Sequence, residues 1–259
     1  MKSNLHLTAL QIPLVWEAPQ TNRAYIDVQL QAISNPTDLI LLPEMFTTGF
    51  TMHPEKIAEP MDGPTVQWMR LWAERLEAAL AGSIVIQEGG QFFNRMLFVC
   101  PDGTLHYYDK HHTFTLAGED QLYTAGRQAG IITYMGWKIC LRICYDLRFP
   151  VWSRNTQDYD LLIYVANWPT PRIQAWDTLL QARAIENMSF VAGVNRIGQD
   201  EKGHTYPGHT ALYDGLGKRL SGALSTAEKA VTAELNYLEL QALRKRLRFL
   251  EDRDNFEWC

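Results

Sequence analysis

Residues 143–150, ICYDLRFP, close an apolar run that begins at Trp137 and turn sharply polar after Cys144. A short apolar run followed by a polar turn is typical of a buried strand that ends at the turn. A thiol at such a strand end lies beside the first backbone N–H groups of the next segment, where a nucleophile can be activated. The stretch therefore predicts a buried strand that presents Cys144 at its end.

Two other ionisable residues occupy comparable positions in the chain. Glu44 ends the run LILLPEMF, and Lys110 directly follows LHYYD. A single cysteine at a strand end is more often a small buried hydrophobic residue. Glu44 alone fits a helix-start carboxylate, and Lys110 alone fits a solvated turn residue. Together, a base, a cation and a thiol at three strand ends make a complete set for acyl transfer.

The rest of the chain alternates short β-type runs with amphipathic helical runs, which indicates an α/β architecture. Residues 38–43, DLILLP, suit a central strand that is covered on both faces. Gly-Gly at 89–90 and Pro-Asp-Gly at 101–103 predict hairpins between successive strands. Hairpins among βα units imply mixed sheets rather than purely parallel ones.

The predicted strands cover residues 5–11, 38–43, 82–87, 93–100, 105–109, 131–134, 138–143, 161–166 and 190–195. A later meander is predicted from residues 210–213, 219–224 and 230–235. The predicted helices cover residues 21–33, with Thr21 as N-cap, and residues 64–80, 174–187 and 238–247. No linker or repeat interrupts this order, so we expect one domain over residues 1–259, with a C-terminal helix and tail at 237–259.

Composition excludes several classes of protein. The chain has 259 residues, 46% hydrophobic and 20% charged, with a formal net charge of −5. Without a basic excess, nucleic acid and anionic membranes are poor partners. No signal peptide and no membrane-spanning run is recognisable, so a cytoplasmic location is expected. The four cysteines do not form a disulfide framework, and free thiols are expected.

The three reactive residues have distinct expected roles in amide hydrolysis. Cys144 attacks, with its thiol pKa lowered by the nearby Lys110 cation. Glu44 takes the thiol proton, passes one to departing ammonia and then activates water. The Lys110 ammonium and the Tyr145 backbone N–H hold the oxyanion. No metal or cofactor is expected, because His111-His112 lacks a third ligand at ligand spacing and no phosphate loop is present.

The strings LLPEMFTTGF, YYDKHHTF and ICYDLRFPVWSRN closely resemble the three signature segments of the carbon–nitrogen hydrolase (nitrilase-like) superfamily. The resemblance includes ANWP and ARAIENMSFVAGVNRIG, extends over residues 5–235 and looks closest to bacterial ω-amidases that act on 2-oxoglutaramate. It implies a four-layer αββα sandwich with mixed sheets and the roles given above for the triad. It also implies that Glu119 orients Lys110 and the substrate amide. Val151 replaces an acidic residue that many relatives carry.

The resemblance further implies a homodimer that forms through the helical face near Cys144. The aromatic C-terminal tail, with Phe249, Phe256 and Trp258, is a plausible contributor to this interface.

The expected reaction converts 2-oxo acid amides to 2-oxo dicarboxylates and ammonia. Arg172 is the preferred partner for the remote substrate carboxylate, whereas Arg148 is expected to brace the turn after Cys144. Phe46, Tyr145, Trp168 and Trp176 are the expected pocket walls. An N-carbamoyl amino acid hydrolase is the alternative within the enzyme class, followed by a true nitrilase. A non-catalytic scaffold is the rival from another class.

Overall fold

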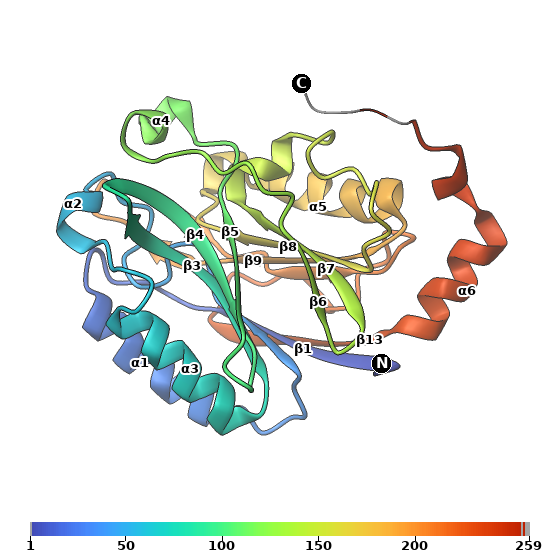
Figure 1. Ribbon diagram of the computed structural model, residues 1–259, viewed down its shortest axis with the longest axis horizontal. Helices are drawn as coiled ribbons and strands as arrows, with labels where there is room; N and C mark the ends of the chain where they lie inside the picture. Colours follow the sequence, from blue (N-terminus) through green and yellow to red (C-terminus); the bar gives the residue numbers. More distant parts are fainter. Residues whose placement is uncertain (1, 255, 257–259) are drawn as a thin grey trace.

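Figure 1 shows the computed structural model of the protein, which describes residues 2–254 and 256. Two sheets pack face to face, and helices cover their outer faces. Helices α1 (Pro19–Gln31) and α3 (Pro64–Leu76) lie against the first sheet, and α5 (Ile173–Asn187) lies against the second. This order of layers confirms the predicted αββα sandwich.

The first sheet has six strands in the order β13-β1-β2-β3-β4-β5. Their bounds are β1 Asn4–Gln11, β2 Leu39–Leu41, β3 Ala79–Glu88, β4 Gln91–Val99, β5 Leu105–Asp109 and β13 Lys229–Asn236. Strands β1, β2 and β3 are parallel, whereas β4, β5 and β13 join by antiparallel pairing. The sheet is mixed, as the hairpin signals predicted.

The second sheet has five strands in the order β12-β9-β8-β7-β6. Their bounds are β6 Ile131–Tyr134, β7 Trp137–Ile143, β8 Leu161–Ala166, β9 Phe190–Asn195 and β12 Ala211–Tyr213. Strands β7, β8 and β9 are parallel, and the two edge strands are antiparallel. The carboxyl ends of β7 and β8 therefore meet at one edge, beside the site described below.

The central strands are apolar on both faces because each face has a core of its own. In β8, Leu161, Ile163 and Val165 point into the core between the two sheets. Leu162 and Tyr164 point to the opposite side and pack with helix α5. The alternation of side chains along a strand explains how one continuous apolar run fills two layers.

The remaining elements are short segments in the connections and, after the last strand, α6 and η4. They are α2 Pro54–Ile57, η1 Thr115–Ala117, α4 Glu119–Leu122, η2 Cys144–Arg148, η3 Thr170–Arg172, β10 Ile197–Gln199, β11 Thr205–Pro207, α6 Tyr237–Leu247 and η4 Phe249–Asp252. Helix α6 extends away from the sandwich toward the C-terminus (Figure 1). No helix in the described ranges combines the length and apolar character needed to cross a membrane.

Several predicted elements differ from the structure. Helix α3 ends at Leu76 because Glu77 adopts a left-handed backbone conformation, and residues 79–80 start strand β3 instead. Helix α1 begins at Pro19, so Thr21 is inside it and is not its N-cap. Residues 219–224 form no strand; only Arg219 makes an isolated bridge, to Tyr213.

Strand β13 also lies in a different place from the one predicted. Residues 230–235 were expected in a meander with residues 210–213, but β13 pairs antiparallel with β1 at the edge of the first sheet. Val231 and Leu235 face the core between the sheets. Their alternation with polar residues is that of a strand with one covered face.

We predict that Leu161→Ala lowers the free energy of unfolding by about 2–5 kcal/mol, because the substitution leaves a cavity between the sheets. Leu161 is 0% exposed, and Leu238 on α6 is 64% exposed and provides a matched control. Leu238→Ala should change the free energy of unfolding by less than about 0.5 kcal/mol. Urea denaturation measures both values. Equal effects of the two substitutions would contradict the placement of β8 in the centre of the core.

Candidate active site

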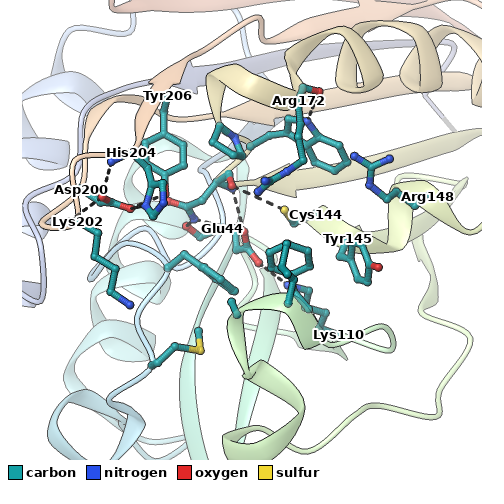
Figure 2. A pocket seen from close by; sticks show the side chains of 18 of the residues that line it. Glu44, Lys110, Cys144, Tyr145, Arg148, Arg172, Asp200, Lys202, His204 and Tyr206 are labelled. Atoms are coloured by element: carbon teal, nitrogen blue, oxygen red, sulfur yellow. Dashed lines mark hydrogen bonds and ion pairs between the residues drawn. The ribbon is translucent and has the colours of Figure 1, made fainter.

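A cavity of about 360 Å³ opens at the ends of the sheet strands, within the size range of small-molecule sites. Glu44, Lys110 and Cys144 all line it (Figure 2). Glu44 follows β2 and Lys110 follows β5, both in the first sheet, whereas Cys144 follows β7 in the second. The structure therefore brings the three predicted residues together at the seam between the sheets.

Cys144 is the first residue of η2 and has a positive φ of 44°. This left-handed conformation is uncommon for a residue with a side chain and is associated with functional turns. The Asp146 side chain accepts from the backbone N–H of Ile143 and so closes the turn. The Cys144 thiol lies 4.0 Å from the backbone oxygen of Asn167. The turn presents the sulfur to the cavity.

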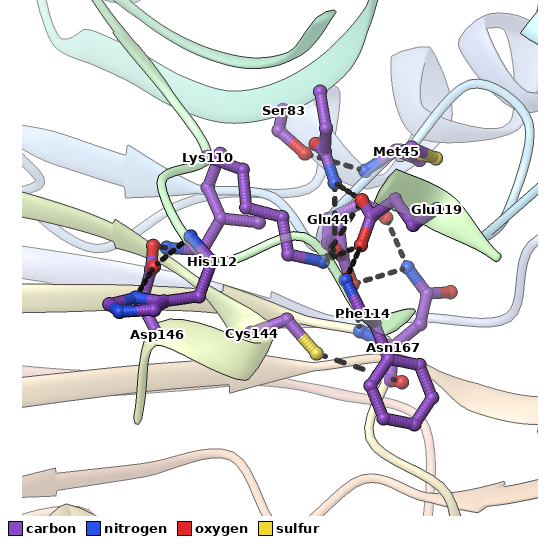
Figure 3. Close-up of polar contacts among 12 residues, drawn as sticks. Glu44, Met45, Ser83, Lys110, His112, Phe114, Glu119, Cys144, Asp146 and Asn167 are labelled. Carbon is purple, nitrogen blue, oxygen red and sulfur yellow. Dashed lines mark hydrogen bonds and ion pairs between the residues drawn. The ribbon is translucent and has the colours of Figure 1, made fainter. Parts of the chain in front are cut away.

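Lys110 is held between two carboxylates in the interior (Figure 3). Its Nζ lies 2.9 Å from Glu44 Oε1 and 2.8 Å from Glu119 Oε2, and the three side chains are 0–1% exposed. Burial lowers the pKa of Lys110, but the carboxylates of Glu119 and Glu44 outweigh burial and raise the pKa above its ordinary value. The ammonium therefore stays charged. The structure places Glu119 beside Lys110, and the action of Glu119 on the substrate amide stays a prediction.

Asn94 and Asn167 donate further hydrogen bonds to Glu44 and Glu119. Asn94 on β4 donates to Glu44 Oε1 at 2.8 Å and to Glu119 Oε1 at 3.2 Å. The Asn167 backbone N–H donates to Glu44 Oε2 at 2.9 Å, and its side chain donates to the Glu44 backbone oxygen at 2.6 Å. Sequence reasoning missed Asn94, although a polar residue inside the apolar run of β4 is a usable signal.

The thiol of Cys144 does not have the lowered pKa that was expected. Burial raises its pKa well above the ordinary value, and the Glu44 carboxylate adds to the rise. The Lys110 ammonium lowers the pKa, as predicted, but its effect is the smaller one. At neutral pH the resting residue is a thiol, so attack requires a base at the moment of reaction.

Three of the predicted binding residues line the cavity, and two do not. Tyr145, Trp168 and Arg172 are in its wall. Phe46 points instead into the core on the helix side of the first sheet, where its ring centre is 5.9 Å from that of Trp68. Trp176 lies behind the wall, 5.5 Å from Trp168 between ring centres, in the core under α5.

The cavity wall contains aromatic residues that the sequence did not predict there. The aromatic wall also contains Trp16, Phe50, Phe114 and Tyr206. Phe50 and Phe114 end two of the strings that carry the Glu44 and Lys110 motifs. Tyr206 belongs to the hairpin of β10 and β11, which also contributes Asp200, Lys202 and His204 to the wall (Figure 2). No local sequence signal marks this hairpin as part of the site.

Two arginines line the cavity on the side of η2 and η3. The Arg172 guanidinium lies 5.3 Å from the centre of the Phe114 ring, and that of Arg148 lies 5.0 Å from the Trp168 ring. Arg148 was expected to brace the turn, but it lies in the cavity wall and is exposed. Besides Lys202, the cavity wall therefore offers two arginines that can bind an anionic group distant from the thiol.

The histidine pair beside Lys110 has structural partners. His112 Nδ1 lies 2.8 Å from Asp146 Oδ1, and His111 Nδ1 lies 2.6 Å from the Gly126 backbone oxygen. Within residues 2–254 and 256, no three or more histidine, cysteine or acidic side chains are grouped as metal ligands.

We predict that Lys110→Met lowers the free energy of unfolding by about 3–5 kcal/mol at pH 7, because two buried carboxylates lose their cation. Burial raises the pKa of Glu119 even beside the ammonium, and removing Lys110 raises it further. The pKa of Glu119 is then higher in the folded variant than in the unfolded chain, so protonation at low pH stabilises the folded variant. The difference in free energy of unfolding between the wild type and the variant should therefore shrink as the pH falls toward about 5. Urea denaturation at both pH values tests this; a deficit that grows with acidification would contradict it.

Comparison with known proteins agrees with this geometry. The sequence model of the carbon–nitrogen hydrolase family matches residues 6–245. The chain is 46% identical over 254 residues to omega-amidase YafV of Yersinia enterocolitica, covering 98% of each chain. It is 31% identical over 252 residues to 2-oxoglutaramate amidase of Bacillus subtilis, covering 95% of this chain and 96% of the relative.

The fold matches a solved structure over its full length. A CN-hydrolase superfamily protein of Xanthomonas campestris, solved with an arsenic adduct in its active site, superposes with a TM-score of 0.96 at 41% identity and covers 100% of both chains. The family match over most of the chain, the relatives and the shared fold agree. The chain belongs to the carbon–nitrogen hydrolase family and is a hydrolase that acts on amides.

Proposed function

We propose that the chain is a thiol amidase that hydrolyses the ω-amide of 2-oxo acid amides, 2-oxoglutaramate foremost, to a 2-oxo dicarboxylate and ammonia. The observation that carries this proposal is the shared cavity of Glu44, Lys110 and Cys144 with Arg148 and Arg172 in its wall. The names of the relatives, omega-amidase and 2-oxoglutaramate amidase, support the substrate class.

In the acylation step, Cys144 Sγ attacks the amide carbon while the thiol proton passes to Glu44. The negative charge that develops on the amide oxygen is stabilised by the Lys110 ammonium and the Tyr145 backbone N–H. Collapse of this intermediate breaks the carbon–nitrogen bond, and Glu44 returns its proton to the departing nitrogen. The products of this step are ammonia and a thioester on Cys144.

In the deacylation step, a water molecule gives a proton to Glu44 and attacks the thioester carbon. Collapse of the second intermediate breaks the carbon–sulfur bond, and the proton returns from Glu44 to the sulfur. The same carboxylate serves both steps because Lys110, Asn94 and Asn167 hold it in one orientation. Glu119 positions the ammonium from the opposite side.

Cys144→Ala should abolish ammonia release, because no other nucleophile in the proposed mechanism reaches the amide carbon. The free energy of unfolding should change little, since the sulfur is at the cavity surface. Cys100 is buried away from the cavity and offers a second thiol for comparison; Cys100→Ala should retain activity. Ammonia release from 2-oxoglutaramate measures both variants. Retained release by Cys144→Ala would refute the mechanism.

The remote carboxylate of the substrate is assigned to Arg172. Arg172 lines the cavity on η3, and its aromatic neighbour Phe114 limits the positions of the guanidinium. Arg148, on η2, is the alternative partner and the matched comparison. A charged hydrogen bond of this type contributes about 1.5–3 kcal/mol.

Arg172→Ala should therefore raise KM for 2-oxoglutaramate about tenfold or more, with a smaller change in kcat. A neutral amide of similar length should show no such rise. Arg148→Ala should have the smaller effect on KM. If Arg148→Ala instead gives the larger rise, the carboxylate belongs to Arg148, and an unchanged KM in Arg172→Ala removes that residue from recognition.

We also propose that the protein acts in the cytoplasm as a homodimer through the helical face near Cys144. Phe249 and Phe256 of the C-terminal segment are 58% and 38% exposed, which supports a role for them in this contact. Trp258, expected to contribute as well, lies outside the described residues.

A further inference from the structure

Asp146, two residues after Cys144, is a fully buried carboxylate that accepts four hydrogen bonds. Its Oδ1 accepts from the backbone N–H of His112 at 3.0 Å and lies 2.8 Å from His112 Nδ1. Its Oδ2 accepts from the Tyr108 hydroxyl at 2.8 Å and from the backbone N–H of Ile143 at 3.0 Å. The proposed mechanism gives this carboxylate no chemical step.

The donors to Asp146 belong to the two segments that carry the reactive residues. Tyr108 and His112 flank Lys110, two residues before it and two after it. Ile143 directly precedes Cys144. One side chain therefore ties the end of β5 in the first sheet to the end of β7 in the second. Figure 3 shows Asp146 and His112 on the side of Cys144 away from Glu119.

The donors are themselves fixed by neighbouring aromatic side chains. The Tyr108 hydroxyl accepts from Trp152 Nε1 at 2.8 Å. The His112 ring stacks on Phe149, with ring centres 3.6 Å apart and planes at 1°. These contacts leave the two donors little freedom to rotate, so the carboxylate meets donors that are already oriented.

We propose that Asp146 is a further positioning residue, which fixes the segment that carries Lys110 relative to the segment that carries Cys144 and so sets the distance between the ammonium and the sulfur. The inference rests on the proposed function, in which the ammonium stabilises the oxyanion formed by attack of this sulfur. A displacement of about 1 Å between such groups can cost about 100-fold in rate. The contribution of Asp146 is therefore to the transition state and not to substrate binding.

A second buried aspartate offers a matched control. Asp160 is 4% exposed and accepts from the Lys138 backbone N–H at 2.9 Å, from Gln241 Nε2 at 3.0 Å and from Arg244 Nη1 at 3.1 Å. These partners lie at the start of β7 and on α6, outside the cavity wall. Asn at either position turns one acceptor oxygen into a donor and breaks comparable hydrogen bonds.

The test compares Asp146→Asn with Asp160→Asn in thermal unfolding and in steady-state ammonia release from 2-oxoglutaramate. Both variants should lose stability. Asp146→Asn should also lower kcat about 100-fold with KM within about threefold of the wild-type value, whereas Asp160→Asn should keep the wild-type kcat below its melting temperature. Equal kcat values for the two variants would overturn the inference.

Two variants of His112 separate its hydrogen bond from its ring stacking. His112→Asn places an amide N–H near the position of Nδ1 but removes the stacking on Phe149, whereas His112→Phe keeps the stacking and removes the donor. Asp146 acts through the hydrogen bond, so His112→Asn should retain kcat within about threefold and His112→Phe should lose about tenfold or more. A lower kcat in His112→Asn than in His112→Phe would show that ring stacking, and not the hydrogen bond to Asp146, determines the rate, and it would contradict the inference.

The outcomes also separate this inference from the proposed function. If the wild-type protein releases no ammonia, or if Cys144→Ala still does, the proposed function fails. If the wild-type protein is active and Cys144→Ala is inactive, but Asp146→Asn matches Asp160→Asn in kcat, the positioning role alone fails.

Discussion

The ion pairs of the buried Lys110 ammonium with Glu44 and Glu119 are the interaction on which the site depends. Charges in the interior are stable only when they are paired and their remaining hydrogen bonds are satisfied. Asn94, Asn167 and the backbone N–H of Phe114 complete this network. Burial raises the pKa of the Cys144 thiol, and the carboxylates of Glu44 and Glu119 add to the rise. The thiol therefore stays protonated, and the base must act during the attack.

The sandwich places this network where two sheets meet. The first sheet contributes Glu44 and Lys110, and the second contributes Cys144 and Asn167. Neither sheet alone holds a complete set of reactive groups, so the geometry depends on the core between them and on polar ties across it. Asp146 is one such tie, because it binds donors from both sheets next to the reactive side chains.

Much of the fold and the site could be predicted because the signals are local. Residues 161–166 form a continuous apolar run, residues 190–195 are apolar up to Asn195, and the structure has strands with these bounds. Glu44 and Cys144 each follow such a run, and Lys110 follows the strand LHYYD. The side-chain direction of Phe46 and Trp176, the pairing of β13 with β1 and the raised pKa of Cys144 depend on segments distant in sequence. The local sequence pattern therefore does not predict these side-chain directions, this strand pairing or this pKa.

The proposed mechanism requires a covalent bond between the substrate carbon and the sulfur of Cys144. Its most direct test is acid quenching of the protein during turnover of 2-oxoglutaramate, followed by mass analysis of its proteolytic peptides. The peptide containing Cys144 is expected to gain the mass of the substrate less that of one ammonia. Modification of another residue, or turnover after the thiol of Cys144 has been blocked irreversibly, would contradict it.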